Sequence, residues 1–152
     1  MYYLNKQVIH KKIHVLMLED ELKKRQFLSR IGAFSVKKGS RNSLITLNYI
    51  RKITKIPENL IVLYPQGKIH SIYQHEIQFE KGIFKALEDN KQFETFFAAC
   101  LPDFSNSKKT FIQILLEKYS ESMQHQVIEK YYNRFLEKVK QQQIQKINLE
   151  NN

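Results

Sequence analysis

The sequence holds a single cysteine, no tryptophan and no long apolar segment. One cysteine cannot form an intramolecular disulfide, and the apolar neighbours of Cys100 predict a small buried side chain rather than a nucleophile. No apolar run approaches the ~18 residues of a membrane-spanning helix. The first residues also lack the apolar core and small-residue cleavage site of a signal peptide. We therefore expect a chain in a reducing compartment, either soluble or bound at a membrane surface.

Several patterns that carry chemistry are also missing. The His, Cys and acidic residues show no metal-ligand spacing, so we expect no bound metal, and there is no phosphate-cradling glycine-rich loop and no nucleophile elbow. Two histidines have an acid five residues on, His14 with Glu19 and His75 with Glu80. Five histidines and 15 acids in 152 residues produce such pairs by coincidence. We assign no catalytic residue within the chain.

Composition favours one folded domain. With 152 residues, of which 42% are hydrophobic and 12% aromatic, the chain can bury one core. We expect an α/β domain over residues 1–140. Residues 141–152, which are rich in Gln and Asn, are expected to form a frayed polar tail.

The net charge of +10 is unevenly distributed along the chain. Residues 1–55 carry 13 Lys or Arg against three acids, whereas residues 56–152 carry 12 of each sign. Such a field attracts an anionic membrane, a phosphorylated ligand or nucleic acid. Charge alone does not choose among these partners, and a lysine-rich solvated surface has the same composition.

Apolar segments of strand length alternate with helical patterns over the first half of the chain. Strands are predicted at residues 13–18, 34–36 and 60–64. The acids Glu19–Glu21 open the first intervening helix, which Gly32 ends, and Ser40 can cap the second. Strands that are apolar on both faces and separated by helices are typical of a parallel sheet covered by helices. The predicted class is therefore α/β with a mixed, largely parallel sheet.

The second half predicts a helix, a hairpin and a long helix. A short helix is expected over 82–87, and strands over 93–101 and 110–116, joined by turn-forming residues into a hairpin at the sheet edge. An apolar stripe from Val127 to Val139 recurs at helical spacing. We expect that stripe to dock on the core.

Two glycine-containing segments follow predicted strands or lead into them. Gly32–Arg41 spans the second strand, and Leu63–Lys68, which reads Leu-Tyr-Pro-Gln-Gly-Lys, ends the third. Open α/β sheets bind ligands at the edge where such segments emerge. The two segments resemble the second and third motifs of the glycerolipid acyltransferases, the lysophosphatidic acid acyltransferase type. The downstream Phe79–Gly82 resembles the Phe-Lys-x-Gly segment of many members.

The resemblance implies a glycerol-phosphate acyltransferase-like fold and an acyltransferase activity. A fatty acyl group would pass from acyl-CoA or acyl-carrier protein, a co-substrate rather than a bound cofactor, to the hydroxyl of a lysophospholipid or related glycerolipid. The resemblance also implies a cytoplasmic protein, peripheral at the inner face of an anionic membrane.

The same resemblance implies a set of substrate-binding residues. A lysine, Lys38, stands where the family's second motif ends in a phosphate-binding arginine, which keeps the charge but loses the bidentate fork. Where the family usually has Phe-Pro-Glu-Gly-Thr-Arg-Ser, this chain keeps only the Pro-x-Gly framework, so the backbone turn is expected to persist. The family's fourth motif, a Val-Pro pair, is not recognisable. The expected substrate-binding residues are Lys38, Arg41, Tyr64, Pro65, Gln66, Gly67, Lys68 and His70.

The family's first motif, Asn-His-x-x-x-x-Asp with the catalytic His and Asp, has no counterpart here. It would lie N-terminal to residue 1, and Met1–Leu4 reads as the interior of a helix. We therefore expect an N-terminally truncated chain with an internal Met1 and little turnover. The absence of tryptophan agrees with this expectation, because a tryptophan often follows the catalytic histidine in relatives.

Two further functions fit the sequence. A non-catalytic module could use the basic N-terminal half to hold anionic lipid. Nucleic-acid binding rests on charge alone, because no recognised RNA-binding motif interleaves aromatic and basic residues. We expect no nucleic-acid partner.

Overall fold

A computed structural model of the chain describes residues 5–36, 42–68, 70–71, 73–88, 93–103 and 111–150. The chain divides into two compact units. Unit 1 comprises Met1–Gly67 and Glu80–Phe93, and unit 2 comprises Lys68–Phe79 and Glu94–Asn152. The sequence predicts a single domain over residues 1–140, whereas each of these units has a sheet of its own.

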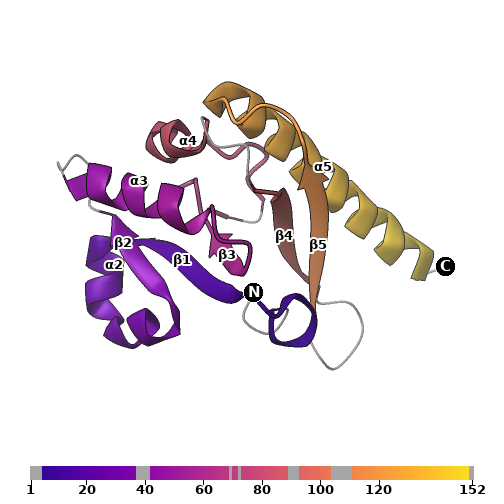
Figure 1. Ribbon diagram of the computed structural model, residues 1–152. Coiled ribbons are helices and arrows are strands. Elements are labelled where there is room, and N and C mark those ends of the chain that lie inside the picture. Colours follow the sequence, from indigo (N-terminus) through magenta and orange to yellow (C-terminus); the bar gives the residue numbers. More distant parts are fainter. Residues whose placement is uncertain are drawn as a thin grey trace. The chain divides into compact units, whose positions relative to one another are not determined.

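Unit 1 contains a three-stranded parallel sheet (Figure 1). Its strands are β1 (Lys12–Leu18), β2 (Ala33–Val36) and β3 (Asn59–Val62), in the order β2-β1-β3. The register aligns Leu18 with Val36 and Val15 with Val62. All three strands therefore end at one edge of the sheet, which we call the carboxyl edge. The predicted parallel arrangement and all three predicted strands are confirmed.

Helices connect or follow the strands of unit 1. They are α2 (Glu19–Lys24), the 3-10 helix η2 (Gln26–Ile31), α3 (Asn42–Ile53) and α4 (Lys81–Leu87), and the π-helical turn η1 (Asn5–Ile9) precedes β1. The sequence predicts one helix from Glu19 to Gly32, but Arg25 is non-helical, with φ −133° and ψ 56°, and divides it. The acids in the first turn of α2 lie where its dipole favours negative charge.

The helices α2 and α3 cover opposite faces of the sheet, because side chains alternate along a strand. On β2, the ring of Phe34 packs edge-on against Tyr49 of α3, with centroids 5.0 Å apart. The next residue, Ser35, faces α2 instead and lines a hollow there. The sheet is thus a layer between two helical layers, the arrangement typical of α/β folds (Figure 1).

Gly32 joins the helical segment to the sheet in a conformation that needs glycine. Its φ is +97°, its amide donates to Ser29 O, and its carbonyl accepts a 3.0 Å bond from Val15 N of β1. A Cβ atom at this position would lie 2.0 Å from the backbone oxygen of Ile13. Both the dihedral angle and the close approach exclude a side chain.

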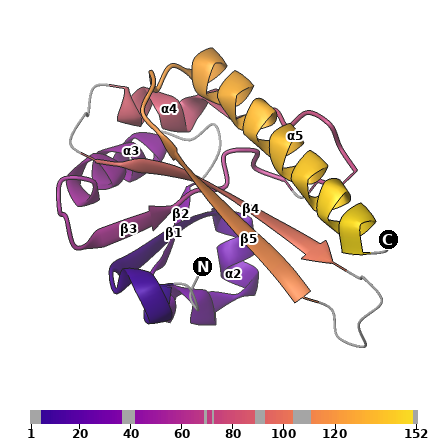
Figure 2. The same cartoon turned by 90° about the vertical axis from the view of Figure 1, so that its right-hand side faces the viewer.

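Unit 2 contains a hairpin and a long helix. The strands β4 (Thr95–Asp103) and β5 (Phe111–Tyr119) pair in antiparallel fashion, and α5 (His125–Glu150) follows them (Figure 2). The hairpin forms a separate two-stranded sheet, so the prediction that it lies at the edge of the parallel sheet and makes that sheet mixed is wrong. The predicted stripe of α5 is confirmed, since Ile128, Phe135 and Val139 are buried. The helix continues through residues 141–150, where the sequence predicts a frayed tail.

The two faces of the hairpin differ in their environment. Phe97 is 7% exposed and Phe96, its neighbour, is 53% exposed, as strand alternation requires. Cys100 has the same parity as Phe96 and is exposed. The prediction of a buried Cys100 is therefore wrong, because α5 packs on only one face of this sheet and the cysteine lies on the other.

Side chains of α5 also bind the segment before α4. Asn133 accepts a 2.8 Å bond from Ile77 N and donates a 3.1 Å bond to Ile77 O. Phe79 N donates to Glu129 at 2.6 Å, and a ring nitrogen of His125 lies 2.8 Å from Phe79 O. These contacts satisfy the backbone polar groups of two buried residues in the way that a neighbouring strand would.

Burial of Tyr119 predicts an alkaline transition of unit 2. Its hydroxyl donates to Ser122 O, and burial first, then the charge of Glu121, raise its pKa to about 12. Because the folded pKa lies above the ordinary ~10, the phenol stabilises the fold fully below about pH 10, and this contribution is lost as the pH rises towards 12.

Urea unfolding of Tyr119→Phe checks this prediction. We expect a loss of about 1 kcal/mol near pH 8 from the missing hydrogen bond, and a smaller fall in stability between about pH 8 and about pH 11 than in the unmodified protein. Burial raises the pKa of Tyr131 and of Tyr132 in the same direction, so some fall persists. Parallel pH curves for the two proteins would contradict the assignment.

Candidate functional site

The turn predicted from the Pro-x-Gly framework is present at the carboxyl edge of unit 1. It follows β3, and Gly67 N donates a 3.1 Å bond to Tyr64 O. Gly67 has a φ of +62°, a left-handed conformation that glycine adopts without strain. Pro65 and Gln66 are half-buried, while Tyr64 is 58% exposed. We call Tyr64–Gly67 the turn segment.

A second hydrogen bond fixes the turn segment to α4. Pro65 O accepts a 2.7 Å bond from Glu80 N, and Glu80 is the residue that precedes α4. The chain therefore returns to the turn after residues 68–79. The two stretches that resemble the third motif and the downstream Phe-Lys-x-Gly segment of the glycerolipid acyltransferases are held together by this bond.

The cationic part of the predicted site follows β2. Lys38 and Arg41 lie outside the described residues. The elements on either side are described: β2 ends at Val36 on the carboxyl edge, and α3 begins at Asn42. Because β2 and β3 run parallel, the segment with Lys38 and the turn segment leave the sheet at the same edge.

The last two residues of the predicted substrate-binding set, Lys68 and His70, belong to unit 2. Lys68 is exposed and His70 is half-buried. The Nδ1 atom of His70 lies 2.6 Å from Gln74 Oε1, and Gln74 uses its amide nitrogen on Glu76 O, so His70 Nδ1 is the donor. The other ring nitrogen, His70 Nε2, is buried without a hydrogen-bond partner among the described residues. The structure does not bring Lys68 and His70 together with the turn segment in one unit.

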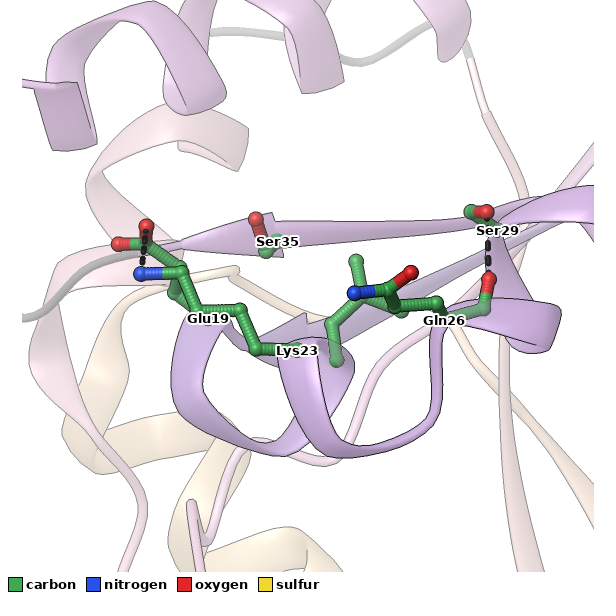
Figure 3. A pocket seen from close by; sticks show the side chains of 6 residues that line it. Glu19, Lys23, Gln26, Ser29 and Ser35 are labelled. Carbon is green, nitrogen blue, oxygen red and sulfur yellow. Dashed lines mark hydrogen bonds and ion pairs between the residues drawn. The ribbon is translucent and has the colours of Figure 1, made fainter.

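A hollow of about 370 Å³ lies on the α2 face of unit 1. Its lining combines residues from α2, η2 and the end of β2, and its rim carries an ion pair between Glu19 and Lys23, 2.7 Å apart (Figure 3). Ser29 donates to Gln26 O at 2.7 Å within it. The lining is mixed in polarity, and Glu19 and Ser35 are its residues nearest to the carboxyl edge. Figure 3 labels the lining residues Glu19, Lys23, Gln26, Ser29 and Ser35, and Leu22 completes the lining.

A buried histidine, to which the sequence assigns no structural role, lies on the opposite, α3 face of the sheet. His14 of β1 is 6% exposed, and its ring nitrogens lie 3.2 Å from Asn59 Oδ1 and 3.2 Å from the hydroxyl of Tyr49. These partners come from β3 and α3. Their sequence separations of 45 and 35 residues leave no local signal, so only the tertiary fold reveals the network.

The hydrogen-bond directions in this network follow from its donors. Asn59 Nδ2 donates to Ile53 O at 3.0 Å, so Asn59 Oδ1 faces His14 and accepts from Nε2–H. The other ring nitrogen of His14, Nδ1, is paired with the hydroxyl of Tyr49. Both ring nitrogens therefore have a hydrogen-bond partner. His14 therefore supports the fold and offers no free nitrogen to a substrate, and Glu19 lies on the other face of the sheet.

Two classes of feature are absent from the part of the chain that the structure describes. No group of three or more His, Cys, Asp or Glu side chains is arranged to hold a metal ion. Within the same residues, no helix combines the length and apolar character needed to cross a bilayer.

The fold defines a mixed α/β protein with a small parallel sheet and covering helices. A scan against models of protein families, a search of curated proteins and a search of solved structures each find no match to this chain.

Proposed function

We propose that the chain is the acceptor-binding part of a glycerolipid acyltransferase domain. The observation that carries the proposal is the parallel order β2-β1-β3, which directs the two motif-like segments to one sheet edge. One segment contains Lys38 and Arg41, and the other is the turn segment. Cationic residues and a Pro-x-Gly turn that follow strands ending at one sheet edge can bind the phosphate and glycerol of a lysophospholipid.

The fold in this proposal is glycerol-phosphate acyltransferase-like. The hydrogen bond between Pro65 O and Glu80 N supports it, because residues of two motif-like stretches meet in space although 15 positions separate them. The turn with a positive φ at Gly67 supports it as well, since this position of the framework needs glycine.

The reaction in this proposal joins a fatty acyl group to the acceptor hydroxyl. The hydroxyl oxygen attacks the thioester carbonyl, a general base removes the hydroxyl proton, and the thiol of coenzyme A or of acyl-carrier protein leaves. Lys38 and Arg41 hold the acceptor's phosphate as a pair of cations. Within unit 1 the Gln66 amide contacts the acceptor or donor, whereas Lys68 and His70 belong to unit 2 and are left out of this site. No residue among 1–152 is assigned as this base, and the proposed place of action is the anionic inner face of a membrane in the cytoplasm.

Calorimetric titration with lysophosphatidic acid below its micellar concentration tests the acceptor site. We expect Lys38→Ala and Arg41→Ala each to weaken binding by about tenfold to a hundredfold, because a hydrogen bond to a charged group contributes about 1.5–3 kcal/mol. Lys38→Arg is expected to bind more tightly than the unmodified protein, since guanidinium contacts phosphate with two parallel bonds.

Lys37→Ala is the matched control, since it removes the same charge one residue away. Equal losses from Lys37→Ala and Lys38→Ala would show a general electrostatic attraction and contradict the assigned site. Lysophosphatidylcholine, whose headgroup is zwitterionic, controls for binding of the acyl chain alone.

A thiol-release assay with acyl-CoA separates the enzyme from a non-catalytic anionic-lipid-binding module. We expect residues 1–152 to bind lysophosphatidic acid with little release of thiol, because loss of a positioned base costs about a hundredfold to ten-thousandfold. A fusion that supplies a His-x-x-x-x-Asp motif in front of residue 1 should release thiol. Binding without release in this fusion would favour the module.

A further inference from the structure

The positive charge of the protein is more concentrated than its N-terminal excess suggests. Residues 22–57 contain ten Lys or Arg and no Asp or Glu, so their net charge of +10 equals that of the whole chain. This stretch includes η2, β2 and α3 of unit 1. The cations of this stretch differ in their surroundings, because those at the end of α2 lie close to the acidic residues of its first turn.

The cations of α2 are paired locally. Lys23 contacts Glu19 at 2.7 Å, and Glu21 contacts both Lys24 at 2.9 Å and Arg25 at 3.3 Å. These ion pairs reduce the field that α2 presents to an anionic surface. The helix α3 differs in composition, since Asn42–Ile53 includes no acidic residue.

The outward face of α3 combines cations with exposed apolar side chains. Ile50 and Ile53 point inward, at 0% and 6% exposure, and Thr46 donates to Ser35 O of β2. Half a turn away, Leu44 is 64% and Ile45 69% exposed. The outward face of α3 consists of Leu44, Ile45, Asn48, Arg51 and Lys52, and Lys55 extends it beyond the helix end; all six are exposed.

We infer that the outward face of α3 is a membrane-binding surface that lies on an anionic lipid leaflet. On this face the apolar Leu44 and Ile45 lie in the first turn of α3, and the cations Arg51 and Lys52 lie in the last turn. Apolar side chains that reach the acyl boundary and basic side chains that meet the lipid phosphates both strengthen binding at a bilayer surface. The absence of acids on α3 favours an anionic bilayer over a protein partner of mixed charge.

This inference deepens the proposed function and rests on it, because an acyltransferase whose acceptor is a lipid must reach that acceptor in the membrane. The segment with Lys38 and Arg41 ends where α3 begins. Docking of α3 therefore holds the first turn of the helix at the level of the lipid headgroups. A lysophospholipid could enter the site without leaving the bilayer.

Single-tryptophan reporters test the inference directly, because the chain contains no tryptophan. Leu44→Trp is the test variant, and Phe27→Trp in η2 is its matched control, since both positions are 64% exposed in unit 1. With phosphatidylcholine–phosphatidylserine vesicles we expect a blue-shifted emission, quenched by brominated lipid, for Leu44→Trp alone. Ile112→Trp, 65% exposed on β5, reports on the hairpin.

Substitutions of lysine by glutamine measure how much the basic side chains contribute to vesicle binding. Lys52→Gln/Lys55→Gln is expected to weaken vesicle binding about 30-fold, which corresponds to about 1 kcal/mol for each basic group. Lys23→Gln/Lys24→Gln removes the same charge from the ion-paired helix and should change binding less than about threefold. Leu44→Gln/Ile45→Gln should lower vesicle binding at least about tenfold and leave calorimetric binding of monomeric lysophosphatidic acid unchanged.

Several results would overturn the inference: no shift at Leu44→Trp, an equal shift at Phe27→Trp, a shift at Ile112→Trp instead, or equal losses from the two lysine pairs. A dimer in light scattering that buries Leu44→Trp without vesicles would assign the face to a second copy of the chain. The proposed function is judged separately by the titration with monomeric lysophosphatidic acid, so failure of either is recognised independently.

Discussion

Gly32→Ala is expected to destabilise unit 1 by at least about 3 kcal/mol, a large part of the total stability of a small protein. A left-handed conformation costs a non-glycine residue about 1–2 kcal/mol. The added Cβ would also lie 2.0 Å from Ile13 O, which belongs to the backbone of the central strand and cannot rotate away. Either β1 shifts or the bond from Val15 N to Gly32 O breaks.

Urea unfolding followed by circular dichroism measures this effect, and Gly82→Ala is its control. Gly82 lies in the first turn of α4, and a Cβ atom added there would meet nothing within 4 Å, so alanine should stabilise by about 0.4–1 kcal/mol. Opposite signs for two Gly-to-Ala changes in one unit separate local strain from general helix propensity. A cost below about 1 kcal/mol for Gly32→Ala would show that β1 yields easily.

The same substitution bears on the candidate site. β2 begins directly after Gly32 and ends at Val36, where the segment with Lys38 leaves the sheet. Loss of the anchor at Gly32 should therefore also weaken binding of lysophosphatidic acid. Gly82→Ala should not.

Local rules predict much of this fold from sequence. The continuous apolar run of β1 identifies a buried strand, Gly32 ends the helical segment because it adopts a positive φ, and the Pro65–Gly67 framework sets a turn. Each of these features depends on residues within a few positions of one another. The parallel topology follows next, because strands separated by helices return in the same direction.

Features that depend on distant partners escape such rules. The pattern of residues 19–31 is helical throughout, yet the chain breaks the helix at Arg25. The apolar run around Cys100 predicts burial, but α5 covers only one face of the hairpin. The same limit applies to the site, since the bond between Pro65 O and Glu80 N and the bonds of His14 join residues far apart in sequence.

Phe97→Ala is expected to destabilise unit 2 by about 3–5 kcal/mol. The Phe97 ring is 7% exposed and contacts four other rings, with centroid distances of 5.0 Å to Tyr119, 5.3 Å to Tyr132, 5.7 Å to Tyr131 and 5.9 Å to Phe135. Truncation removes the centre of this cluster. Large planar rings on a strand and a helix cannot collapse into the space, so most of the cavity persists.

Phe96→Ala is the matched control, because it removes the same side chain from the neighbouring position on the exposed face of β4. We expect its effect on urea unfolding to stay within about 0.5 kcal/mol. The difference between two adjacent Phe-to-Ala changes therefore measures how much the packing of α5 contributes to unit 2. Equal costs would mean that both faces of the hairpin are covered, and α5 alone could not then account for the stability of this unit.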